Sequence, residues 1–236
     1  MRKLIIIASL FLLSALTHTK AQSGIAFWTS GGLSSSRMDD MKYLQEYILT
    51  TFPYEGKSIS AFPPYILAGV GFTKQFYPSL RVGAGYYHST SGSRSNYSDY
   101  SGYLTSEMNA SSNRLGVNAA YVITGNNLIE LSLTGRLEAN YTRLDIQTTV
   151  QVFQFTDLHT NNYHSLSPGG AAGGELMFHL NSISLGLEGG YEVNIPGKLK
   201  KRKEKTELLD PSDRHRQLTS DWTGWYAQLK VMFWLD

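Results

Sequence analysis

The sequence predicts an all-β fold: an eight-stranded antiparallel transmembrane β-barrel with short turns at one end and longer loops at the other. Apolar residues recur at every second position through eight segments, and short and long connections between these segments alternate. The chain is also rich in aromatic residues and glycine, with 15 Tyr, 10 Phe, 4 Trp and 22 Gly. Membrane barrels have these features because successive strand residues point to opposite faces, and aromatic residues gather where strands meet the membrane surface.

The clearest strand spans residues 129–142. Ile129, Leu131 and Leu133 begin one face, whereas Glu130 and Ser132 begin the other. A helix would scatter these residues around its axis. Residues 164–180 and 24–33 alternate more weakly. The predicted strands are 24–33, 65–76, 80–89, 114–123, 129–142, 164–180, 183–193 and 225–235.

The connections support the same architecture. Turn-forming residues make three tight turns at 77–79, 125–127 and 181–182. Longer polar stretches lie at 34–63, 90–110, 153–163 and 196–221. This alternation is typical of short periplasmic turns and longer extracellular loops. A soluble β-sandwich would also bury an alternating apolar face, but it would not explain the alternating loop lengths.

The first long loop holds a possible short helix over residues 36–48. Ser36 suits an N-cap, and Met41, Leu44 and Ile48 share one helical face. The pattern favours a helix packed on the barrel rim. A lid or partner-binding element is the alternative.

The N-terminus has the layout of a secretory signal peptide. Arg2 and Lys3 precede an apolar run from Leu4 to Leu16, and small residues allow cleavage after Ala21. The run is shorter than the roughly 20 residues of a spanning helix, although an anchoring helix remains the alternative. We therefore expect a signal peptide at 1–21, a barrel domain at 22–236, and a location in the bacterial outer membrane.

Composition narrows the possible chemistry. The chain has 21 Lys+Arg against 19 Asp+Glu, so nothing indicates a nucleic-acid partner. It has no Cys, which removes disulfides and thiol chemistry. The six His residues are scattered without metal-ligand spacing, and no phosphate-binding loop is present. We expect no cofactor and no metal.

Several charged residues fall on the inward face of the predicted strands. An eight-stranded barrel is just wide enough for side chains to fill it, and buried charges need partners. The near balance of charge predicts an internal network that closes the lumen, whereas the alternative is a narrow channel for small solutes. The predicted network is Arg81, Arg114, Arg136, Lys230, Glu130, Glu138, Glu175, Glu188 and Glu192.

Turn lengths predict two strand registers. A three-residue turn at 125–127 pairs residue 124 with 128 and places Arg114 opposite Glu138. The turn at 181–182 pairs 180 with 183, which places Glu175 opposite Glu188. Two facing carboxylates repel, so Lys230 is expected near them, or one carboxylate holds a proton.

The hairpin beyond residue 86 carries a family resemblance. It contains Gly92-Ser93-Arg94 and Asp99-Tyr100-Ser101-Gly102. These stretches resemble the outer membrane protein β-barrel domain family, and the strand count is similar to the small OmpA- or OmpX-type barrels. The resemblance implies an integral outer-membrane barrel.

An enzyme is the alternative from another functional class, because some eight-stranded barrels deacylate or acylate lipid A. Such chemistry needs a His beside a Ser and an acidic residue. His88 with Ser89, and His164 with Ser165 or Ser167, lie near the outer strand ends. Adjacent strand residues face opposite ways, which disfavours both pairs. We therefore expect no catalytic residue.

A basic run lies in the fourth long loop. Such a run suits the phosphates of lipopolysaccharide, although it also suits a solvated loop. Its members are Lys198, Lys200, Lys201, Arg202, Lys203 and Lys205.

The expected partners are outer-membrane lipid, lipopolysaccharide and, during biogenesis, the barrel-assembly machinery. The sequence as a whole favours a non-enzymatic structural or surface-interaction protein whose lumen is plugged by side chains.

Overall fold

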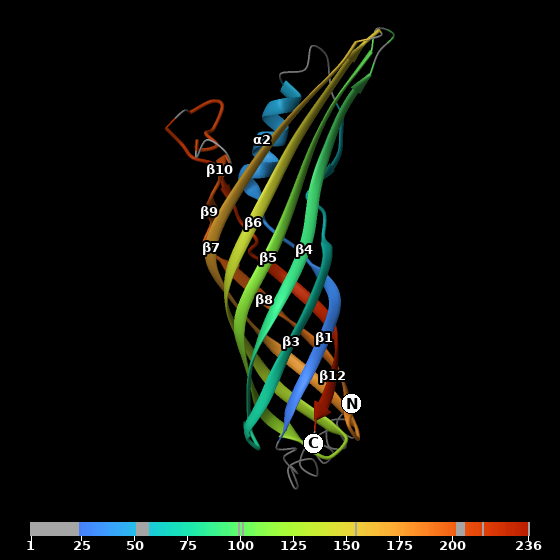
Figure 1. The fold of residues 1–236 in the computed structure, drawn as a ribbon, viewed down its shortest axis with the longest axis vertical. Helices are drawn as coiled ribbons and strands as arrows, with labels where there is room; N and C mark the ends of the chain where they lie inside the picture. The colour runs from blue at the N-terminus through green and yellow to red at the C-terminus, as the bar shows by residue number, and fades with distance from the viewer. Residues whose placement is uncertain are drawn as a thin grey trace, which may run out of the picture.

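The computed structural model describes residues 24–50, 57–98, 100, 102–153, 155–201, 206–213 and 215–235, with only the backbone of 57–61. The expected signal peptide at 1–21 lies outside the described residues. The described chain forms a closed antiparallel barrel with a sheet that projects beyond one end (Figure 1).

Eight strands form the ring, as the alternation predicted. They follow one another in chain order, and the first closes on the last because Ile25 pairs with Leu235. They are β1 (Ile25–Ser34), β3 (Tyr65–Tyr77), β4 (Leu80–Ser98), β5 (Gly102–Gly125), β6 (Ile129–Val152), β7 (Phe155–Leu180), β8 (Ile183–Asn194) and β12 (Gly224–Leu235).

The remaining elements lie at the end with the long connections. Helix α2 (Asp39–Thr50) follows β1, and β2 (Lys57–Ala61) pairs with β4. Strand β10 (Lys200–Lys201) pairs with β7, whereas β9 (Gly197–Lys198) and β11 (Thr219–Ser220) pair with each other. The expected helix is therefore present and begins a few residues later than predicted.

The outer face of the ring is apolar. Leu115 and Leu137 expose 68% and 71% of their surfaces and are flanked by other large apolar residues. This exterior would be costly in water but suits hydrocarbon, where only helices and closed barrels satisfy every backbone group. The closed ring with an apolar belt is the outer-membrane architecture, so the barrel lies in the bacterial outer membrane.

No helix among the described residues is both long and apolar enough to cross a membrane.

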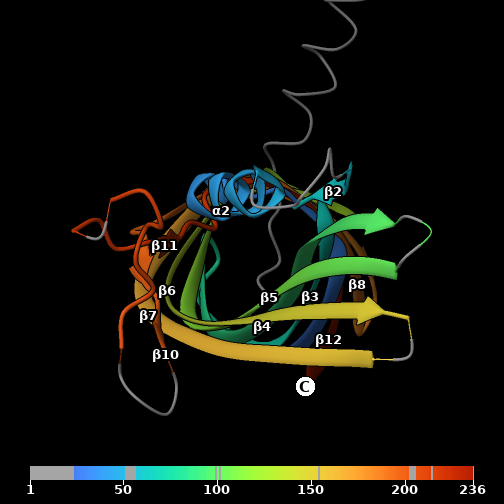
Figure 2. The ribbon, with the colours of Figure 1, turned by 90° about the horizontal axis from the view of Figure 1, so that it is seen from above.

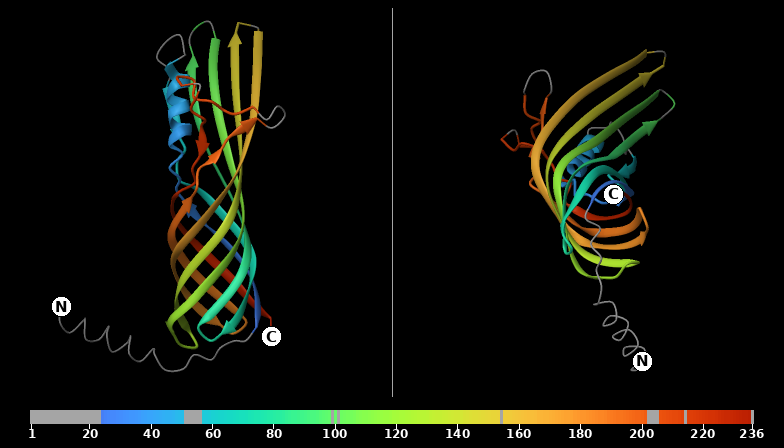
Figure 3. Two further views of the ribbon diagram at one scale, coloured as in Figure 1. Left: turned by 90° about the vertical axis from the view of Figure 1, so that its left-hand side faces the viewer. Right: turned by 60° about the horizontal axis from the view of Figure 1, so that its bottom comes forward.

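Two of the predicted loops prove to be mostly strand. Residues 90–98, 102–110 and 155–163 extend β4, β5 and β7, and β6 continues to Val152. These four strands rise together beyond the other four, and we call this extension the projecting sheet (Figures 1 and 3). Polar composition suggested loops there, but the register continues without interruption from Gly102↔Val152 down to Val122↔Ser132.

The amphipathic pattern of β6 inverts where the strand leaves the membrane. Below this level the outward positions are apolar, as at Tyr141, and the inward positions are polar, as at Thr142. Above it Arg143 is outward and Leu144 is fully buried inward. The alternation continues, but the medium on each face has changed. Outside there is now water, and inside there is protein.

A hydrophobic core lies against the inward face of the projecting sheet. Helix α2 and the described part of the connection between β8 and β12 lie against the sheet (Figure 2) and bury apolar side chains under it. We call this cluster the cap core; its buried members are Met38, Met41, Leu44, Phe62, Tyr65, Met108, Ala110, Leu144, Leu199, Leu218 and Trp222.

The two register predictions had different outcomes. Leu180 pairs with Ile183 and Glu175 lies opposite Glu188, which confirms the register predicted from the turn at 181–182. The register predicted from the turn at 125–127 is wrong, because Arg114 lies opposite Asn140 and not Glu138. The Asn126 side chain accepts hydrogen bonds from the backbone of Leu128 and Ile129. The turn spans residues 126–128 and so lies one residue later than predicted, and a bulge between Val122 and Thr124 also shifts the register.

Inward glycines make room for a tryptophan in the lumen. The Trp28 indole is buried against β3 and β4. A Cβ at Gly71 would lie 2.4 Å from the Trp28 ring and 2.3 Å from the Ala84 carbonyl oxygen. Because the second neighbour is backbone, a side-chain rotation cannot relieve the clash.

We expect Gly71→Ala to destabilise the barrel by about 1–3 kcal/mol through overpacking. Gly135→Ala is the matched control, because a Cβ there meets nothing within 4 Å. Urea unfolding of both variants in lipid bilayers gives the comparison. Equal stability of the two variants would contradict the close packing of Trp28.

Candidate functional site: a charge-filled lumen beneath a projecting sheet

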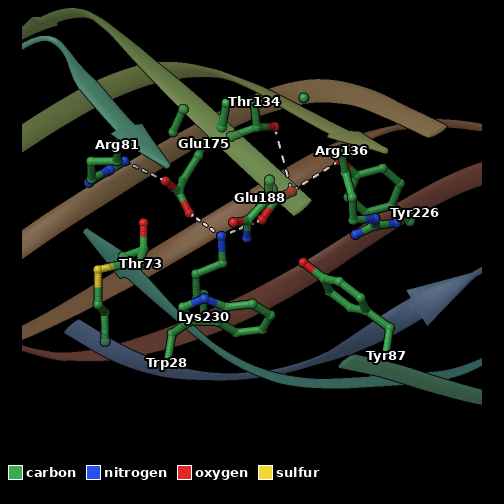
Figure 4. Close-up of a pocket in the computed structure, with 15 residues that line it drawn as sticks. Trp28, Thr73, Arg81, Tyr87, Thr134, Arg136, Glu175, Glu188, Tyr226 and Lys230 are labelled. Carbon is green, nitrogen blue, oxygen red and sulfur yellow. Dashed lines mark hydrogen bonds and ion pairs between the residues drawn. The ribbon is translucent and has the colours of Figure 1, made fainter. Parts of the chain in front are cut away.

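The lower lumen holds a chain of alternating charges. Arg81 Nη2 lies 2.7 Å from Glu175 and 2.8 Å from Glu130. Lys230 Nζ lies 2.6 Å from both Glu175 and Glu188. Figure 4 shows Lys230 pointing between these two carboxylates. The lysine therefore separates the two glutamates that the β7–β8 register places opposite each other.

The upper lumen holds a second group. Arg136 Nε lies 2.6 Å from Glu138, and Arg136 Nη2 lies 3.3 Å from Glu192. Arg114 is fully buried, contacts Glu192 through Nη1, and donates from Nη2 to the Ser89 hydroxyl at 2.8 Å. Its distance to Glu138 is 4.0 Å, so Glu192 is its main partner. The structure thus brings all the predicted lumen charges into these two groups.

Aromatic side chains join the two groups. The Arg136 guanidinium lies 4.0 Å from the centre of the Tyr87 ring, and Trp28 stacks on Tyr87 at 5.4 Å. The Tyr226 hydroxyl donates to Glu188 at 3.0 Å. The cavity left among these residues measures about 30 Å³, which is room for roughly two water molecules. Side chains therefore fill the lumen.

The extracellular end of the lumen is covered by Trp222. Its indole nitrogen donates to the Thr142 hydroxyl at 2.8 Å, and its ring meets Tyr65 edge-on at 5.2 Å between centres. The indole is fully buried and belongs to the cap core. The fourth long connection thus closes the barrel from above.

The periplasmic end carries a hydrogen-bonded chain that the sequence analysis missed. Trp234 Nε1 donates to the Ser184 hydroxyl, which lies 2.8 Å from His179 Nδ1. His179 Nε2 lies 3.5 Å from Glu130. A serine, a histidine and an acid are thus connected, but Ser184 is fully buried and its oxygen already accepts from Trp234. Only the strand registers bring these residues together.

The two proposed His–Ser pairs do not form contacts. His88 Nδ1 lies 3.0 Å from Asn113 on the outer face, whereas Ser89 points inward to Arg114. His164 lies beside the Tyr141 ring. Ser165 bonds to Ser220 and Ser167 to Asn194, both inside. The strand alternation separates each histidine from its neighbouring serine.

The basic run is only partly described. Lys198 and Lys200 are exposed on either side of Leu199, which is buried in the cap core. Lys201 is half-buried. Arg202, Lys203 and Lys205 lie outside the described residues. Among the described residues, no group of His, Asp and Glu has the geometry of a metal site.

The fourth connection is tied to α2 by polar contacts. Arg216 Nη2 contacts Asp40, and Asp40 also accepts from the Thr219 backbone and hydroxyl. Desolvation would raise the pKa of Asp210, but hydrogen bonds from Ser212, Asp213 and Tyr43 outweigh it and hold that pKa below its usual value. These contacts hold the fourth connection against α2.

One edge of the projecting sheet has no partner strand among the described residues. On the side away from β6, β8 pairs with β7 from Gly169 to Leu180. On the same side, β10 pairs with Tyr163 and His164. No described strand pairs with residues 155–162 on that side. Large apolar residues are exposed around the tip of the sheet; they are Tyr100, Tyr103, Val152, Phe153, Phe155 and Leu158.

We expect Lys230→Met to destabilise the barrel by about 3–5 kcal/mol, because it leaves Glu188 facing Glu175 without the shared cation. Adding Glu188→Gln should restore part of the loss, and the double-mutant cycle gives the coupling. Lys74→Met is the control, since Lys74 is exposed on the outer face. A loss that is the same with and without Glu188→Gln would contradict the pairing.

We also expect the barrel to show no stable conductance in planar bilayers, because the ion pairs and Trp222 fill the path. Porin inserted under the same conditions is the positive control. Discrete openings of the parent protein would contradict a lumen closed by side chains.

Comparison with known proteins gives structural neighbours only. No family model matches the chain, and no curated protein sequence matches it. Neisserial surface protein A is 10% identical with a TM-score of 0.38, and the match covers 91% of this chain and 98% of that one. Ail, the attachment invasion locus protein of Yersinia pestis, is 11% identical with a TM-score of 0.39 over 90% and 99%. The translocator domain of the autotransporter NalP from Neisseria meningitidis is 9% identical with a TM-score of 0.25 over 97% and 95%.

Proposed function

We propose that this protein is a surface-interaction protein. In this role the barrel is a membrane anchor, and the projecting sheet binds an extended segment of an extracellular polypeptide. The bound segment adds a strand to the free edge of β7. The observation that carries the proposal is that no described strand pairs with the backbone of residues 155–162 on the side away from β6.

The direction of the edge groups follows from the hydrogen bonds lower on the same strand. The Pro168 carbonyl accepts from the Ile195 backbone on the β8 side, whereas the His179 backbone donates to Leu128 on the β6 side. Backbone groups alternate in direction along a strand, and the β6–β7 register has no shift. Thr156, Leu158, Thr160 and Asn162 therefore direct their backbone groups to the free edge.

Soluble proteins usually protect such an edge with charge, proline or a covering loop. Here the neighbouring apolar residues Phe153, Phe155 and Leu158 expose between 55% and 83% of their surfaces. An added strand gains backbone hydrogen bonds from the edge and apolar contacts from these side chains, which is the mode of β-strand addition.

The rest of the molecule suits an anchoring role. The cap core and its polar contacts hold the projecting sheet to the barrel, and the filled lumen stiffens the base. The role requires neither a nucleophile nor an open pore. It accounts for why the hairpins are paired strands and not loose loops.

The test is a proline on the free edge. Thr160→Pro removes one edge N–H, and because that N–H points away from β6 the ladder to β6 is retained. Thr160→Ala is the matched control, since it removes the side chain and keeps the N–H. The probe is a fluorescent peptide with the sequence of residues 143–152, which already pairs with the other edge of β7.

We expect the parent and Thr160→Ala to bind the peptide alike, and Thr160→Pro to bind several-fold more weakly, as expected for loss of about 0.5–1.5 kcal/mol. Heat-modified migration on gels verifies folding of each variant. Failure of the parent to bind, or equal binding by the proline variant, would overturn the proposal. Dimerisation abolished by Thr160→Pro would assign the edge to a second copy of the chain and overturn it as well.

A further inference from the structure

A continuous row of polar residues crosses the outer face of five neighbouring strands. Each pair in the row is a direct cross-strand neighbour: Thr90 with Ser111, Ser111 with Arg143, Arg143 with His164, and His164 with Lys200. Directly opposed residues share a face of the sheet. At a strand spacing of about 4.8 Å the row extends roughly 19 Å. One end of the row carries the hydroxyl side chains of Thr90 and Ser111, and the other end carries basic side chains.

The row lies where the barrel leaves the hydrocarbon layer. Two residues below it on β6 and β7 are Tyr141 and Leu166, both exposed on the lipid-facing surface. Two residues above Arg143 is Asp145, where the outer face is polar. Two residues of strand rise about 7 Å. The row is therefore at the level of the outer-leaflet headgroups.

A groove of about 560 Å³ opens at the hydroxyl end of the row. Pro63, Pro64 and Ile66 form its apolar part, and polar groups from β4, β5 and β6 complete it. It arises because the chain before β3 leaves β4 between its pairings at Leu67↔Ser89 and Ala61↔Ser93. The polar residues that line it are Thr90, Ser91, Asn109, Ser111 and Asp145.

The charges at the other end are mainly positive. Lys198 and Lys200 are exposed, and Arg143 is about half exposed. Two acids lie nearby. Asp145 pairs with Nε of Arg143 at 3.0 Å, and Glu207 bridges to Lys200 through its backbone. No described residue forms an ion pair with the terminal nitrogens of Arg143, so these can bind an external anion.

We propose that this row and its groove bind the phosphorylated sugar headgroup of an outer-leaflet glycolipid. The sugar lies in the groove, where hydroxyl, amide and carboxylate groups accept and donate hydrogen bonds and the prolines contact its apolar face. The phosphate lies on Arg143 and Lys200, with His164 between them. The acyl chains then extend down the apolar surface past Leu166.

In this proposal the described lysines of the basic run help to bind the phosphate. Lys198 and Lys200 had been singled out by charge alone. Arg143 and His164 belong to distant parts of the sequence and join them only through strand pairing. The glycolipid site and the peptide-binding edge share none of the residues tested, so either proposal can fail without the other.

The first test removes the cations. The parent barrel and the double variant Arg143→Gln/Lys200→Gln are placed in nanodiscs, and native mass spectrometry measures bound lipid. The probes are a diphosphorylated lipid A, its dephosphorylated form and phosphatidylglycerol. The matched control is Arg94→Gln/Lys74→Gln: Arg94 is an outward arginine paired with Glu107 at 3.1 Å, and Lys74 lies near the opposite membrane surface.

We expect the parent to bind the phosphorylated glycolipid about tenfold more tightly than the dephosphorylated form, as expected for one charge-assisted contact of about 1.4 kcal/mol. The Arg143/Lys200 variant should lose this preference, and the control should retain it. An equal loss in the control, or no loss in either, would overturn the site. Equal affinity for phosphatidylglycerol would overturn recognition of a sugar.

The second test fills the groove. Thr90→Trp places a large ring in the groove, and Thr156→Trp places the same ring on the outer face near the tip of β7. Only Thr90→Trp should weaken glycolipid binding, and phosphatidylglycerol binding should be unchanged in both. Undiminished glycolipid binding by a folded Thr90→Trp variant would overturn the role of the groove.

Discussion

The rest of the structure depends on neutralising charge inside a narrow closed barrel. The β7–β8 register places Glu175 opposite Glu188, and such a pair would repel in a medium of low dielectric constant. Strand β12 pairs with β8 and places Lys230 Nζ between the two carboxylates, at 2.6 Å from each. The contact thus needs three strands in one register. Arg81 on β4 also reaches Glu175 across the lumen at 2.7 Å, so these charges are paired only when the ring is closed.

The same alternation serves two environments in one strand. Within the membrane, β6 directs leucines to lipid and glutamates to the lumen; beyond the membrane, it directs Arg143 to water and Leu144 to the cap core. Where the strand leaves the membrane, the medium changes on both of its faces. The outward side chains therefore become polar and the inward ones apolar at the same height. The polar row on the outer face and the cap core on the inner face therefore both follow from the position of the membrane surface along the strands.

Much of the ring could be predicted because lipid exposure imposes a local rule that each strand obeys alone. The eight strands, the three tight turns and the inward set of charges follow from the two-residue period. The upper halves of β4, β5 and β7 were misjudged as loops, since Ser-, Thr- and Asn-rich strands have the composition of loops. Their continuation showed only as a reversal of the pattern at Arg143 and Leu144. The predicted β5–β6 register was also wrong, because the Asn126 side chain holds a turn that lies one residue later in the chain.

The sequence by itself determined the alternation, and with it the fold class, the lipid-facing surface and the residues that face inward. Tertiary structure alone decided which inward charges meet, since Arg114 and Glu192 lie on strands that become neighbours across the lumen and not along the sheet. It also decided that Arg143, His164 and Lys200 form one row. The physical reason is that side-chain direction depends on local backbone geometry, whereas contact across a barrel depends on the register of every strand between the two residues.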